Sequence, residues 1–148
     1  MVVWRLQGIG HPLINSEGAK LTGGRWNQPG TSVIYASEDT VLAAMEVIVH
    51  HGGIPGDYVA IKIEIPDDLE IGTLDIPDGW PDLVPEIVTA EQGTNWVTAS
   101  RQAVLRVPSA TMSLSGYNYV LNPAHPDFKR ISFSFEPVKI DPRLRRLS

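Results

Sequence analysis

Alternating apolar and polar positions mark the strands of this chain. In YVAIKIEI, residues 58–65, four apolar side chains fall on one face, and Lys62 and Glu64 fall on the other. This period of two is typical of a half-buried strand, and Pro66 ends it. Similar apolar runs predict five more strands, at Val2–Leu6, Ser32–Ala36, Ala103–Val107, Asn118–Asn122 and Arg130–Phe135.

Helical patterns are fewer and are separated by turn residues. Ser37 is the expected N-cap of a helix that runs to about His51 and stops at Gly52–Gly53. A second helix is expected near Trp80 and a third near Thr94–Arg101. Strands outnumber helices, so we expect an α+β protein with a sheet core and flanking helices. No repeat or linker interrupts residues 1–148, which predicts a single domain.

Composition narrows the possible functions. The 148 residues are 43% hydrophobic and include no Cys, which excludes disulfides and a thiol nucleophile. A net charge of −5 argues against direct nucleic-acid binding. We find no apolar run long enough for a membrane span and no signal-peptide pattern, so a cytoplasmic protein is expected. The four His residues lack metal-ligand spacing, and no metal site is expected.

Glu46 is the most informative polar residue. It lies in AAMEVIVH, a helical stretch that is apolar on nearly all sides, which predicts a buried helix. Burying an unpaired carboxylate costs on the order of several kcal/mol of folding free energy, the effective penalty for an ion in a protein interior. Such a residue therefore needs hydrogen-bond donors or a function. One interpretation is a structural pair with His50, four residues further on. The other is a carboxylate at a reaction site.

The segment GGRWNQPG, residues 23–30, places Arg25, Trp26 and Asn27 in a glycine-rich turn. Glycine allows a backbone to approach a ligand closely, and a guanidinium suits phosphate or carboxylate groups. The P-loop pattern is absent. The alternative is a plain turn in which Trp26 fills the core and Arg25 points into solvent.

Four more polar residues are candidates for a site. Tyr35 ends the second predicted strand, eleven residues before Glu46, and is either a stacking residue or a core tyrosine. Ser109 follows a proline but lacks the G-x-S-x-G context of an acyl nucleophile. Asn118 and Asn122 are four residues apart and would share one strand face.

In this order, the motifs GGRWNQPG, VIYAS, AAMEVIVH, LRVPSA and NYVLNPAHPDF resemble the RES domain, over about residues 4–128. The resemblance implies a fold related to ADP-ribosylating toxins. It places the family's Arg, Tyr, Glu and Ser at Arg25, Tyr35, Glu46 and Ser109, with Arg5 as a further matching arginine.

The resemblance also implies a function. It identifies the chain as a bacterial toxin of a toxin–antitoxin system that cleaves the nicotinamide–ribose bond of NAD⁺ and depletes it. Glu46 would stabilise the cationic ribose, while Tyr35 would flank the nicotinamide and Ser109 would bind substrate or orient Glu46. Six residues would bind NAD⁺: Arg5, Arg25, Asn27, Tyr35, Asn118 and Asn122.

The same resemblance implies partners, and two rival functions stay open beside the toxin. The expected partner is an Xre-type helix-turn-helix antitoxin, and self-association is expected. The first rival is an ADP-ribosyltransferase that modifies a protein. A rival of another class is a non-catalytic interaction module in which Glu46 and the glycine-rich turn are structural.

Overall fold

The strands of this protein form one mixed sheet of seven members in its computed structural model, which describes residues 1–10, 16–112 and 115–145. The order across the sheet is β4-β5-β6-β2-β1-β3-β7. All neighbours are antiparallel except β4 and β5. The strands are β1 Val2–Gly8, β2 Ile34–Ser37, β3 Tyr58–Glu64, β4 Ile71–Gly72, β5 Val104–Pro108, β6 Tyr117–Leu121 and β7 Ser132–Glu136.

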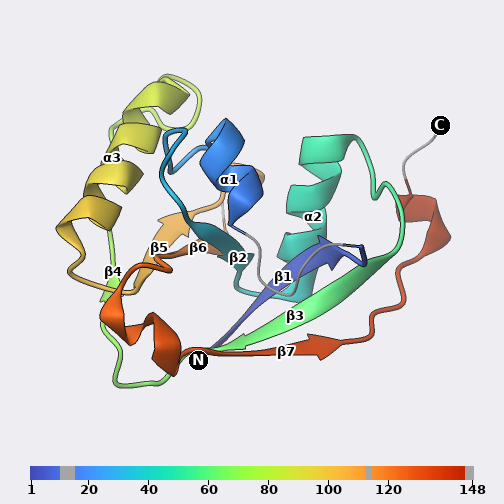
Figure 1. Cartoon of the computed structure of the whole chain (residues 1–148). Coiled ribbons are helices and arrows are strands. Elements are labelled where there is room, and N and C mark those ends of the chain that lie inside the picture. The colour runs from blue at the N-terminus through green and yellow to red at the C-terminus, as the bar shows by residue number, and fades with distance from the viewer. Residues whose placement is uncertain (11–15, 113–114, 146–148) are drawn as a thin grey trace.

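The described residues form three α-helices, which lie on one side of this sheet (Figure 1). They are α1 Glu17–Thr22, α2 Thr40–His51 and α3 Glu86–Ala99. Two 3₁₀ helices, Pro126–Arg130 and Pro142–Leu144, flank β7 in the chain. None of the helices within the described ranges is long and apolar enough to cross a membrane.

The sheet is apolar on both faces, because each face packs against different segments. Trp26 and Trp96 pack with Leu105 and Val120, and Leu6 packs with Ala43 of α2. A separate cluster gathers the opposite-facing residues of the same strands. Its fully buried members include Val3, Ile34, Ile61, Ile63, Val104 and Leu121.

The sheet opens between β1 and β2. These strands share a single register pair, Trp4 with Ser37, whereas β1 pairs with β3 along its whole length. Beyond Trp4, the carbonyl oxygen of Tyr35 accepts a hydrogen bond from Arg5 Nη1 at 2.9 Å. The Arg5 side chain thus lies in the gap between β1 and β2, beyond their single register pair.

The structure confirms all six predicted strands, with small shifts at their ends, and the α+β expectation. The cap of α2 was wrong: Asp39, not Ser37, accepts from Leu42 N, while Ser37 ends β2. The helix does end at Gly52, whose left-handed φ of 74° favours glycine.

Two other helix predictions also change. The helices expected near Trp80 and at Thr94–Arg101 are replaced by one helix, α3, because Pro85 starts it and the turns around Trp80 precede it. The expectation that α2 is buried on all sides was wrong as well. Only Leu42 and Ala43 are buried, and Val41 and Val49 are 71% and 64% exposed. Sequence patterns missed α1 and the two-residue β4.

Candidate functional site

A cavity of about 880 Å³ lies where β1 and β2 separate. Its walls come from β1, α1, the glycine-rich turn, β2, α2 and the loop after β5. The predicted site residues that line it are Arg5, Arg25, Tyr35, Glu46 and Asn118. Segments far apart in the sequence therefore meet at one hollow.

Glu46 is the centre of the hydrogen-bond network in this cavity. Its Oε1 accepts from Ser109 Oγ at 2.8 Å, Asn118 Nδ2 at 2.9 Å and Thr111 Oγ1 at 3.1 Å. Oε2 receives none of these three bonds. The side chain is half-buried, so the donors replace water around one oxygen and leave the other for a ligand.

The donors to Glu46 are themselves fixed. Ser109 is 1% exposed, and its hydroxyl accepts from Thr111 N at 3.1 Å while it donates to Glu46. Ser37 Oγ donates to Asn118 Oδ1 at 2.7 Å, across the β2–β6 register pair. The alternative in which Glu46 pairs with His50 is therefore wrong, because no ion pair among the described residues joins these two side chains.

Tyr35 joins the sheet to the glycine-rich turn. Its hydroxyl donates to Asn27 Oδ1 at 2.5 Å and accepts from Trp26 N at 3.1 Å. Burial, above all, raises the pKa of this phenol well above its ordinary value. A Cβ on Gly24 would lie 2.9 Å from the Tyr35 hydroxyl, so this contact requires glycine.

Arg25 is positioned through its backbone. Its carbonyl oxygen accepts from Thr89 Oγ1 of α3 at 2.6 Å, and the next residue, Trp26, packs directly on α3. A Cβ on Gly93 would lie 1.7 Å from the Trp26 carbonyl oxygen, so the turn and α3 are in close contact. The Arg25 guanidinium lies 5.9 Å from the ring centre of Trp80 and lines the cavity.

Arg5 supplies a second cation to the same cavity. Its Nε donates to Gln7 Oε1 at 3.1 Å, and its Nη1 donates to the Tyr35 carbonyl. Burial lowers the pKa of this guanidinium, because removal from water disfavours the charged form. Neither Arg5 nor Arg25 takes part in an ion pair within the described parts of the chain. Two arginines outside any ion pair line a cavity whose wall also includes Glu46 and Glu86, and guanidinium groups so placed favour an anionic ligand.

Three predicted residues do not line the cavity. Asn27 is 1% exposed, and its amide donates to carbonyls of Ala19 and Thr31, so it holds the turn together. Asn122 lies beneath α3, where its amide faces Val97 O at 3.4 Å and its oxygen accepts from Ala124 N. Ser109 contacts Glu46 but is not part of the wall. The expectation that Asn27 and Asn122 face a ligand is therefore not supported by their positions.

Sequence reasoning missed two residues that belong to the Glu46 network and line the cavity, Ser37 and Thr111. The sequence pattern predicts a helix cap at Ser37 instead. Thr111 carried a weak signal: it follows Ser109 at a spacing of two, which lets a loop direct both hydroxyls to one acceptor.

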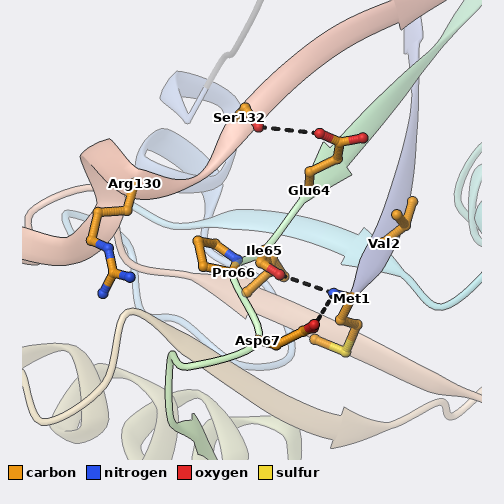
Figure 2. Close-up of a pocket in the computed structure, with 8 residues that line it drawn as sticks. All are labelled: Met1, Val2, Glu64, Ile65, Pro66, Asp67, Arg130 and Ser132. Atoms are coloured by element: carbon orange, nitrogen blue, oxygen red, sulfur yellow. Dashed lines mark hydrogen bonds and ion pairs between the residues drawn. The ribbon is translucent and has the colours of Figure 1, made fainter.

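A second hollow, of about 320 Å³, lies at the start of β1 (Figure 2). Asp67 in this hollow pairs with the Met1 amino group at 2.9 Å, and Arg130 pairs with the nearby Asp68 at 2.6 Å. Because these charges are already paired, this hollow differs from the larger cavity, whose two arginines form no ion pair within the described ranges.

The large cavity combines a hydrogen-bonded carboxylate, a buried tyrosine and two arginines. Its volume lies in the range of about 300–1,000 Å³ that small-molecule sites occupy. In the described ranges no group of three or more His, Cys, Asp or Glu residues is placed to hold a metal ion. The arrangement can bind an anion at the arginines and stabilise a positive charge beside Glu46.

Comparisons with known proteins show the family of this chain. The model of the RES domain family matches residues 2–143. The chain belongs to the RES domain family. It is 38% identical over 125 residues to the "Prs ADP-ribosylating toxin" of Sphingobium sp. (strain YBL2), which covers 80% of the chain and 77% of that protein.

Two other relatives are each named "Toxin Res". The Photorhabdus laumondii protein is 37% identical over 131 residues, or 80% of the chain and 83% of that protein. The Pseudomonas putida protein is 32% identical over 149 residues, or 97% of the chain and 99% of that protein. The RES family that contains this chain thus includes these toxins.

A solved structure shares the fold. The chain matches a chain in the M. tuberculosis MbcT–MbcA toxin–antitoxin complex with a TM-score of 0.71 over 97% of its own length and 85% of the other. Sequence identity is 18%, so the match shows the fold alone. The expected α+β fold of a RES toxin is confirmed.

Proposed function

We propose that this RES domain is an enzymatic toxin that cleaves the nicotinamide–ribose bond of NAD⁺. The observation that carries the proposal is the position of Glu46, which lines a cavity with two arginines and whose Oε1 is held by three donors. NAD⁺ has the matching chemistry: a pyrophosphate for the arginines and a ribose that becomes cationic during reaction. The name of the Sphingobium relative supports ADP-ribose chemistry.

The reaction breaks one bond between ribose C1′ and the nicotinamide nitrogen. The electron pair leaves with the nicotinamide ring, which becomes neutral, and the ribose becomes an oxocarbenium ion. Glu46 Oε2 would face this cation and the ribose hydroxyls, and its attraction is strongest when the sugar charge is fully developed. Water, phosphate or a protein nucleophile then adds to C1′.

The arginines would hold the rest of the substrate. Arg25 and Arg5 would bind the pyrophosphate, because guanidinium groups bind phosphate oxygens through paired hydrogen bonds. Tyr35 would flank the nicotinamide with its ring, since its hydroxyl is already bonded to Asn27. Holding the pyrophosphate and the nicotinamide fixes the glycosidic bond between them beside Glu46.

Glu46→Gln tests this function. The substitution keeps the shape and removes the charge, so nicotinamide release should fall about 10²–10³-fold. The matched control is Glu91→Gln, an exposed carboxylate on α3, which should leave the rate unchanged. If wild-type protein neither binds NAD⁺ by calorimetry nor releases nicotinamide, the non-catalytic module is the better description.

The acceptor of ADP-ribose distinguishes two versions of the function: water or phosphate in one, and a protein in the other. Release of soluble ADP-ribose species indicates NAD⁺ depletion, and NMR of the products with and without phosphate separates hydrolysis from phosphorolysis. The second version is transfer of ADP-ribose to a protein, and the name of the 38%-identical Sphingobium relative, an ADP-ribosylating toxin, is the reason to test it. With radiolabelled NAD⁺, a labelled protein band would identify that transfer.

An antitoxin partner is part of the proposal, and an Xre-type protein is the candidate. Exposed aliphatic side chains at or beside the cavity wall support a covering partner: Leu21 on α1, Val49 on α2 and Ile87 on α3 are 74%, 64% and 70% exposed. Coexpression and size-exclusion chromatography would reveal this complex and any self-association. A Leu21→Asp variant should weaken the complex without slowing NAD⁺ turnover, because Leu21 lies outside the cavity wall.

A further inference from the structure

Ser37 occupies the point where three strands meet. It pairs in register with Trp4 of β1 and with Asn118 of β6, and it is the residue at which β1 and β2 are still joined. Its side chain is 4% exposed, and its hydroxyl donates to Asn118 Oδ1 at 2.7 Å. A buried hydroxyl at this point therefore controls the neighbouring amide.

The orientation of the Asn118 amide determines whether its nitrogen or its oxygen faces Glu46 Oε1. In the observed orientation Nδ2 donates to Glu46 Oε1 at 2.9 Å. With the amide rotated by half a turn, its oxygen would face the carboxylate, and two acceptors would oppose each other. Ser37 stabilises the productive orientation, because its hydroxyl gives Oδ1 a donor on the side away from Glu46.

We propose that Ser37 is a positioning residue that acts on Glu46 through Asn118. The proposal rests on the NAD⁺-cleaving function above and adds a residue of the cavity wall whose hydroxyl is used to hold Asn118. Ser109 and Thr111 bind the same Oε1 from the loop after β5, so the sheet and the loop hold one oxygen from two directions. Oε2 then keeps a constant position toward the sugar.

Ser37→Ala is the first test. Loss of the hydroxyl lets the Asn118 amide rotate, so kcat should fall about tenfold, as loss of one hydrogen bond in a network predicts. KM should stay within about twofold, because the arginines that bind the phosphates are untouched. Ser37→Cys, with a weak donor of similar size, should lie between wild type and Ser37→Ala and serves if the alanine variant does not fold.

Two comparisons isolate the route through Asn118. Ser32→Ala is the matched control, since Ser32 Oγ also donates a short side-chain hydrogen bond, to Ser16 Oγ at 2.6 Å, and lies outside the cavity wall. Its kcat should equal that of wild type. In an Asn118→Ala background, the Ser37→Ala change should have no further effect on kcat, because its target is gone. Equal losses in both backgrounds would overturn the route.

A measurement without NAD⁺ separates this inference from the proposed function. The side-chain amide hydrogens of Asn118, assigned by their loss in Asn118→Ala, should exchange with solvent at least tenfold faster in Ser37→Ala than in wild type or Ser32→Ala. If wild-type protein releases no nicotinamide but the exchange changes as stated, the function fails and the positioning role stands. If wild-type protein is active and neither kcat nor exchange responds to Ser37→Ala, the positioning role is wrong.

Discussion

At the scale of single residues, the site depends on how closely the glycine-rich turn approaches β2. Gly24→Ala should displace Tyr35, because the new Cβ would lie 2.9 Å from its hydroxyl and 3.0 Å from Asn27 Oδ1. We expect a loss of about 1–3 kcal/mol in the free energy of unfolding, the usual cost of crowding a packed site. Urea denaturation measures it. Gly56→Ala, where a Cβ meets nothing within 4 Å, is the control and should be close to neutral.

The sequence identified some site residues better than others. Arg25, Tyr35 and Glu46 belong to short segments whose composition is unusual, an arginine among glycines and a carboxylate in an apolar helix, and all three line the cavity. Ser37 and Thr111 belong to no such pattern. Their partners lie 81 and 65 residues away, so their roles depend on strand pairing and loop path that local patterns do not encode.

At the scale of elements, α2 carries Glu46 to the cavity and Asp39 starts α2. The Asp39 carboxylate accepts from Leu42 N at 2.7 Å. Asp39→Ala should lower the free energy of unfolding by about 1 kcal/mol, the usual cost of losing an N-cap. NAD⁺ turnover should change little, since Glu46 lies two turns further on and is held by Oε1 contacts from the sheet and loop. Glu38→Ala, an exposed neighbour, is the stability control, and an equal loss there would refute the cap assignment.

Elements with strict alternation were predictable, and elements defined by long-range packing were not. β3 alternates along its whole length and was found within one residue of its bounds. α3 has few features of an amphipathic helix, and its small residues reflect contacts with the glycine-rich turn, where Gly93 meets the Trp26 backbone. β4 contains two residues and exists because β5 pairs with it.

At the scale of the whole molecule, buried tyrosines couple stability to alkaline pH. Burial is the main factor that raises the pKa of Tyr35, and it also raises the pKa values of Tyr58 and Tyr119. Above the unfolded value near 10, the unfolded chain loses the phenol proton and the folded chain keeps it, so stability falls as pH rises. Between pH 10 and 11, Tyr35 should account for about 1 kcal/mol of that loss. In Tyr35→Phe the decline measured by urea denaturation should be shallower by this amount, and an identical slope would contradict the assignment.

The cavity also joins distant parts of the molecule, and a bound dinucleotide should stabilise all of them together. Its walls include β1 and β2, which separate after one register pair, and the turn that packs on α3. In Glu46→Gln, where turnover is slow, NAD⁺ at one hundred times its Kd should add about 2.7 kcal/mol to the free energy of unfolding and raise Tm by about 5–10 °C. Differential scanning fluorimetry measures this shift.

Adding Arg25→Ala should shrink the shift at the same NAD⁺ concentration, because phosphate contacts are lost. The exposed Arg101→Ala should leave it intact. If NAD⁺ leaves the Tm of the Glu46→Gln protein unchanged, the cavity binds another ligand.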